Sequence, residues 1–526
     1  MKKQTGFIGK ASSLLCASIL LMATATTAIQ AKTLKIAYDA DPVTLDIHEL
    51  LSAGILQLSH MTHDPLVRWT KDFKFEPRLA KSWERLDDQT VRFHLRDDVK
   101  FHTGNKMTAK DVKWTFDRLK KSPDFKGIFT NFKDLKVVDD NTVDLVTDGP
   151  YPLVMHTATY IFPMDSKFYT GKDEKGNDKA AIVKNGASFA STHSSGTGPY
   201  TVESREQGVK VVFKRNPNYW DKASKGNADT VILTPIKDNQ TRVAALLSGD
   251  VDFIAPVAPN EFGQVESNDK VKLVTMPGTR IITFQMNQAR RNEFKDVKVR
   301  QAIVNAVNNP GIVKKIMKGF ATPAGQMSPK GYLGYNESLK PRFDLAKAKK
   351  LMSESSYPDG FSITMMAPNN RYVNDEKIAQ AVAAMLSKIG IKVDLKTMPK
   401  AQYWPEFDKR AADMMMIGWH SDTEDSANFY EFLAMTPNKE TGMGAYNAGN
   451  YSSKFVDEMT MKANKETDPA KRAEMLQAIE KKLYDDAAFV PLHWQNLAWA
   501  ARKGVKIEPV VNAMNFPYIG DLVIED

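Results

Sequence analysis

The chain has 526 residues, of which 42% are hydrophobic and 26% are charged. It is too long for one compact domain and has enough apolar side chains for large cores. Basic residues outnumber acidic ones by 72 to 63, but the charges are mixed along the chain without a basic tail or arginine-rich stretch, which argues against nucleic-acid binding.

The N-terminus has the layout of a secretory signal peptide. Lysines near the start precede an uncharged apolar run, 14–23, and small or polar residues follow up to Ala28 and Ala31. The run is shorter than the roughly 20 residues that a bilayer span needs. We therefore predict a signal peptide over 1–31, with cleavage after Ala31 or, as a second choice, after Ala28, and export to the periplasm.

The only cysteine, Cys16, lies inside this apolar run. A lipid-attachment cysteine requires a small residue before it, whereas here Leu15 precedes it, so no lipid anchor is expected. The mature chain then has no disulfide, no thiolate metal site and no cysteine nucleophile. A large exported protein can manage without disulfides.

Hydrophobic periodicity predicts the first elements. Residues 33–38 alternate as a strand. Residues 91–95 and 99–101 alternate on either side of an Asp-Asp turn, which predicts a hairpin. Thr108 and Asp111 have capping-box spacing before a helical pattern.

The second half predicts an α/β unit. Asp296 is expected to cap a helix, and 361–366 reads as a strand. Asn374 is expected to cap a helix that Gly390 ends, before a strand from 391 to 395. Strand, helix and strand in this order build parallel sheets. A short apolar run, Met414 to Trp419, predicts a buried strand with an acidic loop after it.

Several motifs in order resemble one family. Residues 79–117 read LAKSWERLDDQTVRFHLRDDVKFHTGNKMTAKDVKWTFD, which looks like the signature of bacterial solute-binding proteins for peptides, nickel and related ligands of ABC importers. Ser426 stands where the family usually has proline. The further matching segments are GTGPY at 196–200, RNPNYW at 215–220, LLSGDVD at 246–252, the helices at 296–307 and 344–351, and the loop at 418–429.

The resemblance implies an α/β fold of the periplasmic-binding-protein type, in which two lobes are joined by a hinge and close around a ligand. The implied organisation has an extra subdomain inserted in the first lobe, whose aromatic residues Trp83, Phe93, Phe101 and Trp114 are expected in the core. The implied boundaries are 32–76, 195–283 and 499–526 for lobe I, 77–194 for the inserted subdomain and 284–498 for lobe II.

Two charged residues lead the candidate ligand site. Asp422 follows the predicted strand 414–419, and ligands of open α/β sheets bind beyond the carboxyl ends of strands. By resemblance it matches the aspartate that takes a peptide ammonium group; without the resemblance it is one acid of a solvated loop. Arg371 lies in a loop after the predicted strand 361–366, and a guanidinium can bind a carboxylate bidentately. It matches the region where dipeptide-binding relatives place such an arginine, although a surface ion pair is an equal alternative.

Other candidates are weaker. The backbone of Phe284, Gln285, Met286 and Asn287 could pair with an extended ligand as an added strand does. Further candidates for the pocket wall are Trp419, His420, Tyr403 and Trp404. Core packing explains Tyr403 and Trp404 equally well, and a lone histidine is more often simply hydrogen-bonded.

The charged pair favours short zwitterionic peptides as ligands. A nickel complex, an opine, haem or an oligosaccharide stay open as alternatives, although no histidine-rich cluster is visible. A secreted hydrolase is disfavoured because the chain has no G-x-S-x-G, H-E-x-x-H or phosphate-loop pattern. We expect a monomer without metal or cofactor that delivers its ligand to an ABC permease of the inner membrane.

Overall fold

The computed structural model describes residues 31–42, 44–183 and 187–525. Contacts divide the chain into two units, 1–31 and 32–526. Apart from Ala31, the predicted signal peptide lies outside the described residues.

An 11-stranded sheet dominates the second unit. We call β15, β14 and β16 the β14 half of this sheet, and β11, β1, β10, β9 and β8 the β1 half. In spatial order the strands are β15 (Ile391–Met398), β14 (Phe361–Pro368), β16 (Met414–Trp419), β12 (Val271–Met286), β17 (Phe489–Arg502), β11 (Phe253–Ala255), β1 (Thr33–Tyr38), β10 (Thr230–Pro235), β9 (Lys210–Arg215) and β8 (Tyr200–Glu206), and β13 (Ala321–Pro323) pairs with β17.

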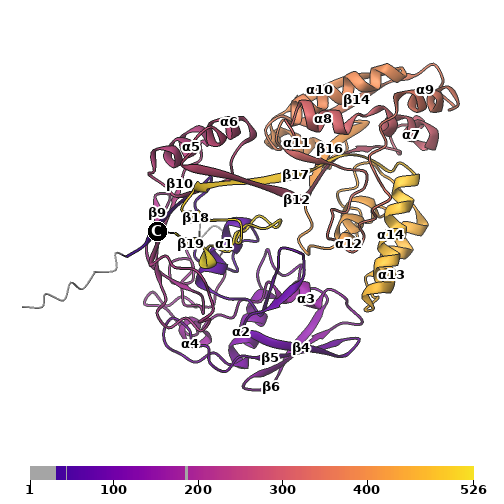
Figure 1. Ribbon diagram of the computed structural model, residues 1–526. Helices are drawn as coiled ribbons and strands as arrows, with labels where there is room; N and C mark the ends of the chain where they lie inside the picture. The colour runs from indigo at the N-terminus through magenta and orange to yellow at the C-terminus, as the bar shows by residue number, and fades with distance from the viewer. Residues whose placement is uncertain (1–30, 43, 184–186, 526) are drawn as a thin grey trace, which may run out of the picture. The chain divides into compact units, whose positions relative to one another are not determined.

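Two long strands join the halves. β12 pairs with β16 through residues 281–286 and with β17 along most of its 16 residues. β17 in turn pairs with β11, where Ile254 faces Ala500. Figure 1 shows β12 and β17 side by side between the two halves. The expected lobe boundary at residue 284 therefore falls inside one uninterrupted strand.

The predicted strand–helix–strand unit is confirmed in the β14 half. β14 and β15 are parallel, with Phe361 opposite Ile391, and α10 (Asp375–Leu386) connects them. Gly390 ends the following 3-10 turn with a φ of 83°. Asn374 stands at the N-cap position as predicted, but its side chain donates to the carbonyl of Ile316 and does not cap the helix. Asp375 accepts the N–H groups of Arg371 and Tyr372, which precede the helix.

A separate four-stranded sheet forms from residues 80–147 in the order β4 (Ala80–Asp87), β5 (Thr90–Leu95), β7 (Thr142–Thr147) and β6 (Phe132–Asp139). The predicted hairpin is wrong. β5 pairs with β4 and β7, while Val99 and Phe101 are buried in a connecting segment.

The capping prediction in this region is confirmed. The backbone N–H and the hydroxyl of Thr108 both donate to Asp111, at 2.8 and 3.1 Å, where α2 (Ala109–Leu119) begins. The core placement is confirmed too, since Phe93 and Phe101 are buried and Trp83 and Trp114 pack against the same core.

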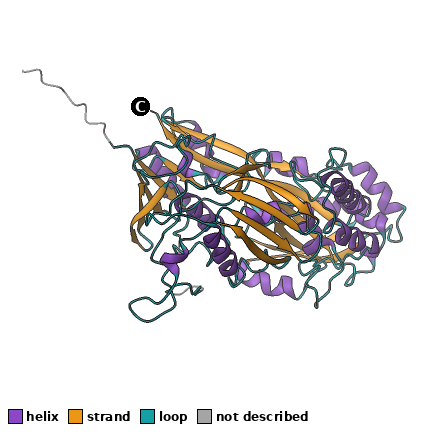
Figure 2. Ribbon diagram, turned by 90° about the horizontal axis from the view of Figure 1, so that it is seen from below, coloured by secondary structure: helices purple, strands orange, loops and turns teal. Residues whose placement is uncertain are grey.

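Helices flank the strands (Figure 2). An apolar core of β12, β14, β16, α7 and α10 side chains fixes the β14 half. The remaining helices are α1 (Ala53–Thr62), α3 (Val154–Ala158), α4 (Ser166–Tyr169), α5 (Asn239–Ser248), α6 (Phe262–Glu266), α7 (Val297–Ala306), α8 (Asn309–Lys315), α9 (Leu345–Ser353), α11 (Lys400–Asp408), α12 (Ser426–Phe429), α13 (Lys454–Ala463) and α14 (Pro469–Asp485). The short pairs are β2 (Val67–Trp69) with β3 (Phe75–Pro77) and β18 (Val505–Lys506) with β19 (Val523–Ile524).

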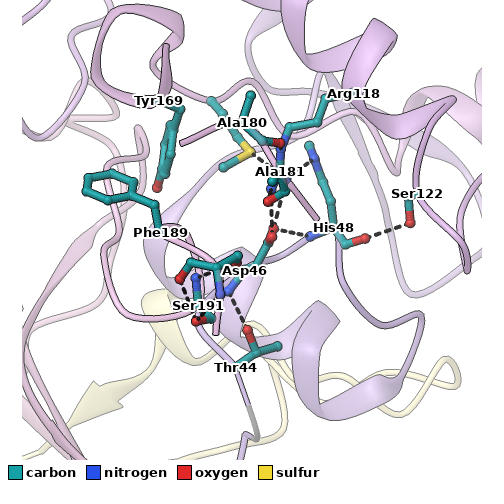
Figure 3. Close-up of polar contacts among 12 residues, drawn as sticks. Thr44, Asp46, His48, Arg118, Ser122, Tyr169, Ala180, Ala181, Phe189 and Ser191 are labelled. Carbon is teal, nitrogen blue, oxygen red and sulfur yellow. Dashed lines mark hydrogen bonds and ion pairs between the residues drawn. The ribbon is translucent and has the colours of Figure 1, made fainter. Parts of the chain in front are cut away.

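A buried charged cluster holds the loop after β1 against α2 (Figure 3). Arg118 forms two hydrogen bonds to the carboxylate of Asp46, at 2.6 and 2.8 Å, and a third at 3.0 Å to Nδ1 of His48. It also donates to the carbonyl of Ala180, and Ser122 donates to the carbonyl of His48. Both charged side chains are almost completely buried, so the pair fixes these segments through interactions that water does not screen.

None of the described helices combines the length and apolar character needed to cross a membrane.

Candidate functional site

The order of the strands brings the two leading candidates to one edge of the sheet. β14 and β16 run parallel as neighbours, so their carboxyl ends lie together. Arg371 follows β14 and Asp422 follows β16. This edge is where open α/β sheets bind ligands.

A second arginine, Arg280, reaches the same edge from β12. The pairing of β12 with β17 is interrupted between Pro277 and Ile281. Gly278 lies in this interruption, where a Cβ atom would come within 2.6 Å of the carbonyl oxygen of Gln495. The irregularity turns the backbone before Arg280 out of the ladder. Sequence reasoning did not find this residue, and the available signal was the Pro-Gly pair that breaks an otherwise strand-like segment.

Two adjoining cavities meet at these residues. Their volumes are about 460 and 490 Å³, and both are lined by Arg280, Arg371, His420 and Asp422. The first cavity also has an aromatic wall of Trp404, Trp419 and Tyr446. The second extends to the loop after β1, to β17 and to the C-terminal segment, through Asp39, Leu497 and Phe516 respectively.

The charged groups at the centre are not paired with one another. Within the described part of the chain, the side chains of Arg280 and Asp422 make no hydrogen bond or ion pair. Desolvation raises the pKa of Asp422, and the neighbouring Glu424 adds to this, although His420 and Arg280 oppose it. Desolvation and the charge of Arg371 lower the pKa of Arg280. Both shifts mean that the ionised side chains lack the water or counter-charge that would stabilise them.

Asp422 is exposed and lines both cavities, so its carboxylate faces them. The guanidinium of Arg371 is also exposed and lies 5.0 Å from the ring centre of Tyr372. The Tyr372 hydroxyl accepts a hydrogen bond of 2.7 Å from the N–H of Gly418. These contacts fix the two loops relative to each other and leave the charged ends free.

The loop around Asp422 is held by its neighbours. The hydroxyl of Thr279 lies 2.8 Å from Nδ1 of His420, and Nε2 of His420 lies 3.4 Å from Glu424. Glu424 is buried and accepts a hydrogen bond from Tyr332.

Asp425, the next acid of the loop, has a structural role. It caps α12 and binds Arg472 through two hydrogen bonds of 2.6 and 2.7 Å. Both of these side chains are buried. Only Asp422 of the three acids in this loop is thus available to a ligand.

The structure brings five of the candidate residues to the cavities, namely Asp422, Arg371, Trp419, His420 and Trp404. Trp419 is additionally fixed by a 2.8 Å hydrogen bond from its indole N–H to Asn428. The ligand roles of all five stay predictions.

The other candidates do not line these cavities. Phe284 and Met286 are buried core residues. The backbone of Phe284 cannot pair with a ligand because it has β16 on one side and β17 on the other, and Met286 pairs with Met414 of β16. Asn287 is buried and accepts hydrogen bonds from Arg290 and Asn450. Tyr403 is buried, with its hydroxyl donating to the carbonyl of Met416. The added-strand expectation is therefore wrong, and the core alternative describes Tyr403.

Within the described residues, no group of three or more His, Cys, Asp or Glu side chains is arranged to hold a metal ion.

A sheet with two halves joined by long strands, and a charged cavity where its strands end, defines a two-lobed solute-binding protein. Residues 74–441 match the model of the bacterial extracellular solute-binding proteins, family 5 middle region, and the chain belongs to this family. The family supplies solute-binding components of ABC importers, which work with a permease and are not enzymes.

Individual relatives agree with this assignment. The glutathione-binding protein GsiB of Escherichia coli strain K12 is 26% identical over 508 residues, which cover 94% of this chain and 95% of that protein. The periplasmic binding protein DppA of Helicobacter pylori, solved with the peptide STSA, is 25% identical with a TM-score of 0.72 and covers 94% of this chain and 98% of its own. HbpA2 of Haemophilus parasuis shares the fold at 22% identity and a TM-score of 0.83, covering 94% and 100% of the two chains.

Proposed function

We propose that this protein captures short peptides in the periplasm and delivers them to an ABC permease of the inner membrane. The observation that carries the proposal is the presence of unpaired opposite charges, Asp422 and Arg371, on the walls of the same cavities. A peptide has an ammonium group at one end and a carboxylate at the other, so it matches this arrangement.

In the proposed complex, Asp422 binds the ammonium group and Arg371 binds the terminal carboxylate. Charge-assisted hydrogen bonds are strong where bulk water is excluded. The raised pKa of Asp422 supports this role, because a bound cation would supply the counter-charge that the carboxylate lacks.

The relatives support a peptide ligand as well. GsiB is named for glutathione, itself a short peptide, and DppA was solved with a tetrapeptide. A nickel complex, an opine, haem or an oligosaccharide is the alternative in the same fold. A sugar ligand would call for stacked aromatic rings more than for an acid and two arginines.

We also propose the lobe boundaries 32–76, 195–283 and 499–526 for lobe I, 77–194 for the inserted subdomain and 284–498 for lobe II. The strands β12 and β17, which contain the boundaries 283/284 and 498/499, then act as the hinge. With the signal peptide 1–31 removed and no lipid attached, the mature protein is a free monomer.

Native mass spectrometry of the protein purified without unfolding is the first test. We expect retained peptide masses that are released on denaturation. A single metal complex, opine, haem or sugar mass would contradict the peptide function while leaving the family unchanged.

Calorimetry with the stripped protein tests the ammonium site. We expect Asp422→Asn to weaken peptide binding by about tenfold or more, because a hydrogen bond to a charged group is lost. The control Asp394→Asn changes an exposed acid on β15, outside both cavities, and should bind as the wild type does. Unchanged affinity in Asp422→Asn would refute the ammonium role.

A further inference from the structure

The role of Arg280 is not explained by a zwitterionic ligand with one ammonium and one carboxylate. Its guanidinium is partly buried and makes no hydrogen bond or ion pair to any residue that the structure describes. Arg371, the other guanidinium, acts on it electrostatically. A partly buried cation beside a like charge is unfavourable unless an anion joins them.

Arg280 shares both cavities with the two residues proposed to hold the ligand ends, and its strand β12 lies beside β16, which Asp422 follows. It lines both cavities together with Arg371 and Asp422. Ile281, the next residue along β12, pairs with Trp419 at the end of β16, and Asp422 follows three residues later. A ligand held by Asp422 and Arg371 therefore lies in the same cavities as the guanidinium of Arg280.

The other acids of the cavity walls do not neutralise this position. Glu424 is buried and engaged by Tyr332 and His420. Asp408 and Asp39 are exposed, and each lines only one of the two cavities. Among the described residues, none of these carboxylates lies within 4.0 Å of Arg280.

We propose that Arg280 binds a second carboxylate of the ligand, so that the preferred ligands are short peptides with an acidic side chain between their termini. This inference rests on the peptide function proposed above. Because a guanidinium binds carboxylates through two parallel hydrogen bonds, the contact selects for charge and for shape.

Two tripeptides test this with a difference of one group. Ala-Glu-Ala and Ala-Gln-Ala have nearly the same shape, and only the first has a side-chain carboxylate. In calorimetry at neutral pH and low salt, the stripped wild type should bind Ala-Glu-Ala about tenfold more tightly or better. In Arg280→Gln the ratio of the two affinities should fall to about one, and Arg280→Lys should retain part of the preference.

Arg96→Gln is the matched control. It removes an arginine that pairs with Asp98 on the surface, outside both cavities, and should keep the wild-type ratio. Equal affinity of the wild type for the two peptides would overturn the inference and leave the peptide function standing. The inference would also be overturned if Arg280→Gln weakened the binding of both peptides equally, because Arg280 and Arg371 would then bind the same carboxylate. If neither peptide binds the wild type, both proposals fail.

Discussion

The hydroxyl of Tyr160 donates a 2.5 Å hydrogen bond to the backbone carbonyl of Asp422. Tyr160 comes from the segment 77–194, whereas Asp422 follows β16 in the β14 half of the sheet. Burial raises the pKa of Tyr160 far above its usual value, so the phenol stays protonated and remains a donor. The segment that resembles an insertion thus helps to fix the loop proposed to hold the ligand.

Replacing Tyr160 with Phe should weaken ligand binding. The lost hydrogen bond corresponds to about 1 kcal/mol, or roughly a fivefold decrease in affinity, because the Asp422 loop becomes less ordered. Calorimetry measures the affinity, and thermal unfolding measures the stability. Tyr169→Phe is the control, since the Tyr169 hydroxyl is also hydrogen-bonded and buried but lines neither cavity. It should lose stability without losing affinity, and equal affinity losses in both variants would contradict the role of Tyr160.

Gly278→Ala should disturb the position of Arg280. The added Cβ would lie 2.6 Å from the carbonyl oxygen of Gln495, a backbone atom that cannot move away easily. We expect about 1–3 kcal/mol of lost stability, measured by urea unfolding, together with weaker binding of acidic peptides. Gly263→Ala is the control, because nothing lies within 4 Å of its Cβ position in α6. Unchanged stability of Gly278→Ala would show that the strand irregularity adapts to a side chain.

The buried pair of Asp46 and Arg118 should contribute strongly to stability. Asp46→Ala leaves the Arg118 charge buried without its carboxylate, which costs about 3–5 kcal/mol. The exposed pair of Arg96 and Asp98 provides the comparison, because Asp98→Ala should cost less than about 1 kcal/mol. Urea unfolding of both variants measures the difference, and similar losses would refute the special role of the buried pair.

Buried histidines should make the protein sensitive to acid. Burial lowers the pKa of His63 to about 3 and those of His156 and His493 to about 4. The unfolded chain takes up these protons near pH 6.5 and the folded chain does not, so the stabilising contribution is complete above about pH 6.5 and is lost as the pH falls toward 4. Glu431 contributes to stability with the opposite pH dependence. Burial raises its pKa to about 7, so its stabilising contribution is lost as the pH rises.

The measurement is the urea midpoint at a series of pH values between about 7.5 and 4. His156→Phe should reduce the decrease of the urea midpoint as the pH falls, because a phenyl ring takes up no proton. The ring should fit the site, since His156 packs edge-on against Trp69 and Phe75. A wild-type midpoint that does not fall below pH 6.5 would contradict the prediction.

Local patterns were sufficient to predict the β14 half. The alternation in 361–366 and 391–395 and the helical spacing between them depend on neighbouring residues, and the structure has β14, α10 and β15 there. The hairpin prediction was wrong because the neighbours of a strand do not depend on local patterns alone. Val99 and Phe101 have the right character for a strand, but β5 has β4 on one side and β7, which comes much later in the chain, on the other. A pattern identifies a strand without identifying its neighbour.

The same limit applies to the site. Asp422 and Arg371 could be predicted because each follows a recognisable strand and matches a family motif. The Pro-Gly pair before Arg280 marks the irregularity opposite β17, but the position of β12 beside β16, which brings Arg280 to the site, is not revealed by a single sequence. The error at Phe284 has the same origin, since only the order of the strands shows that both edges of β12 are occupied.

The pairing of β11 with β17 sets a condition on the time at which this protein can fold. Ile254 meets Ala500, and Asn227 is hydrogen-bonded to Ile524 near the C-terminus. The β1 half therefore cannot be completed until almost the whole chain has been synthesised, and pairings between such distant residues form slowly. Until β17 has been made, β11 pairs with β1 alone, and its other edge is open to strands of neighbouring chains.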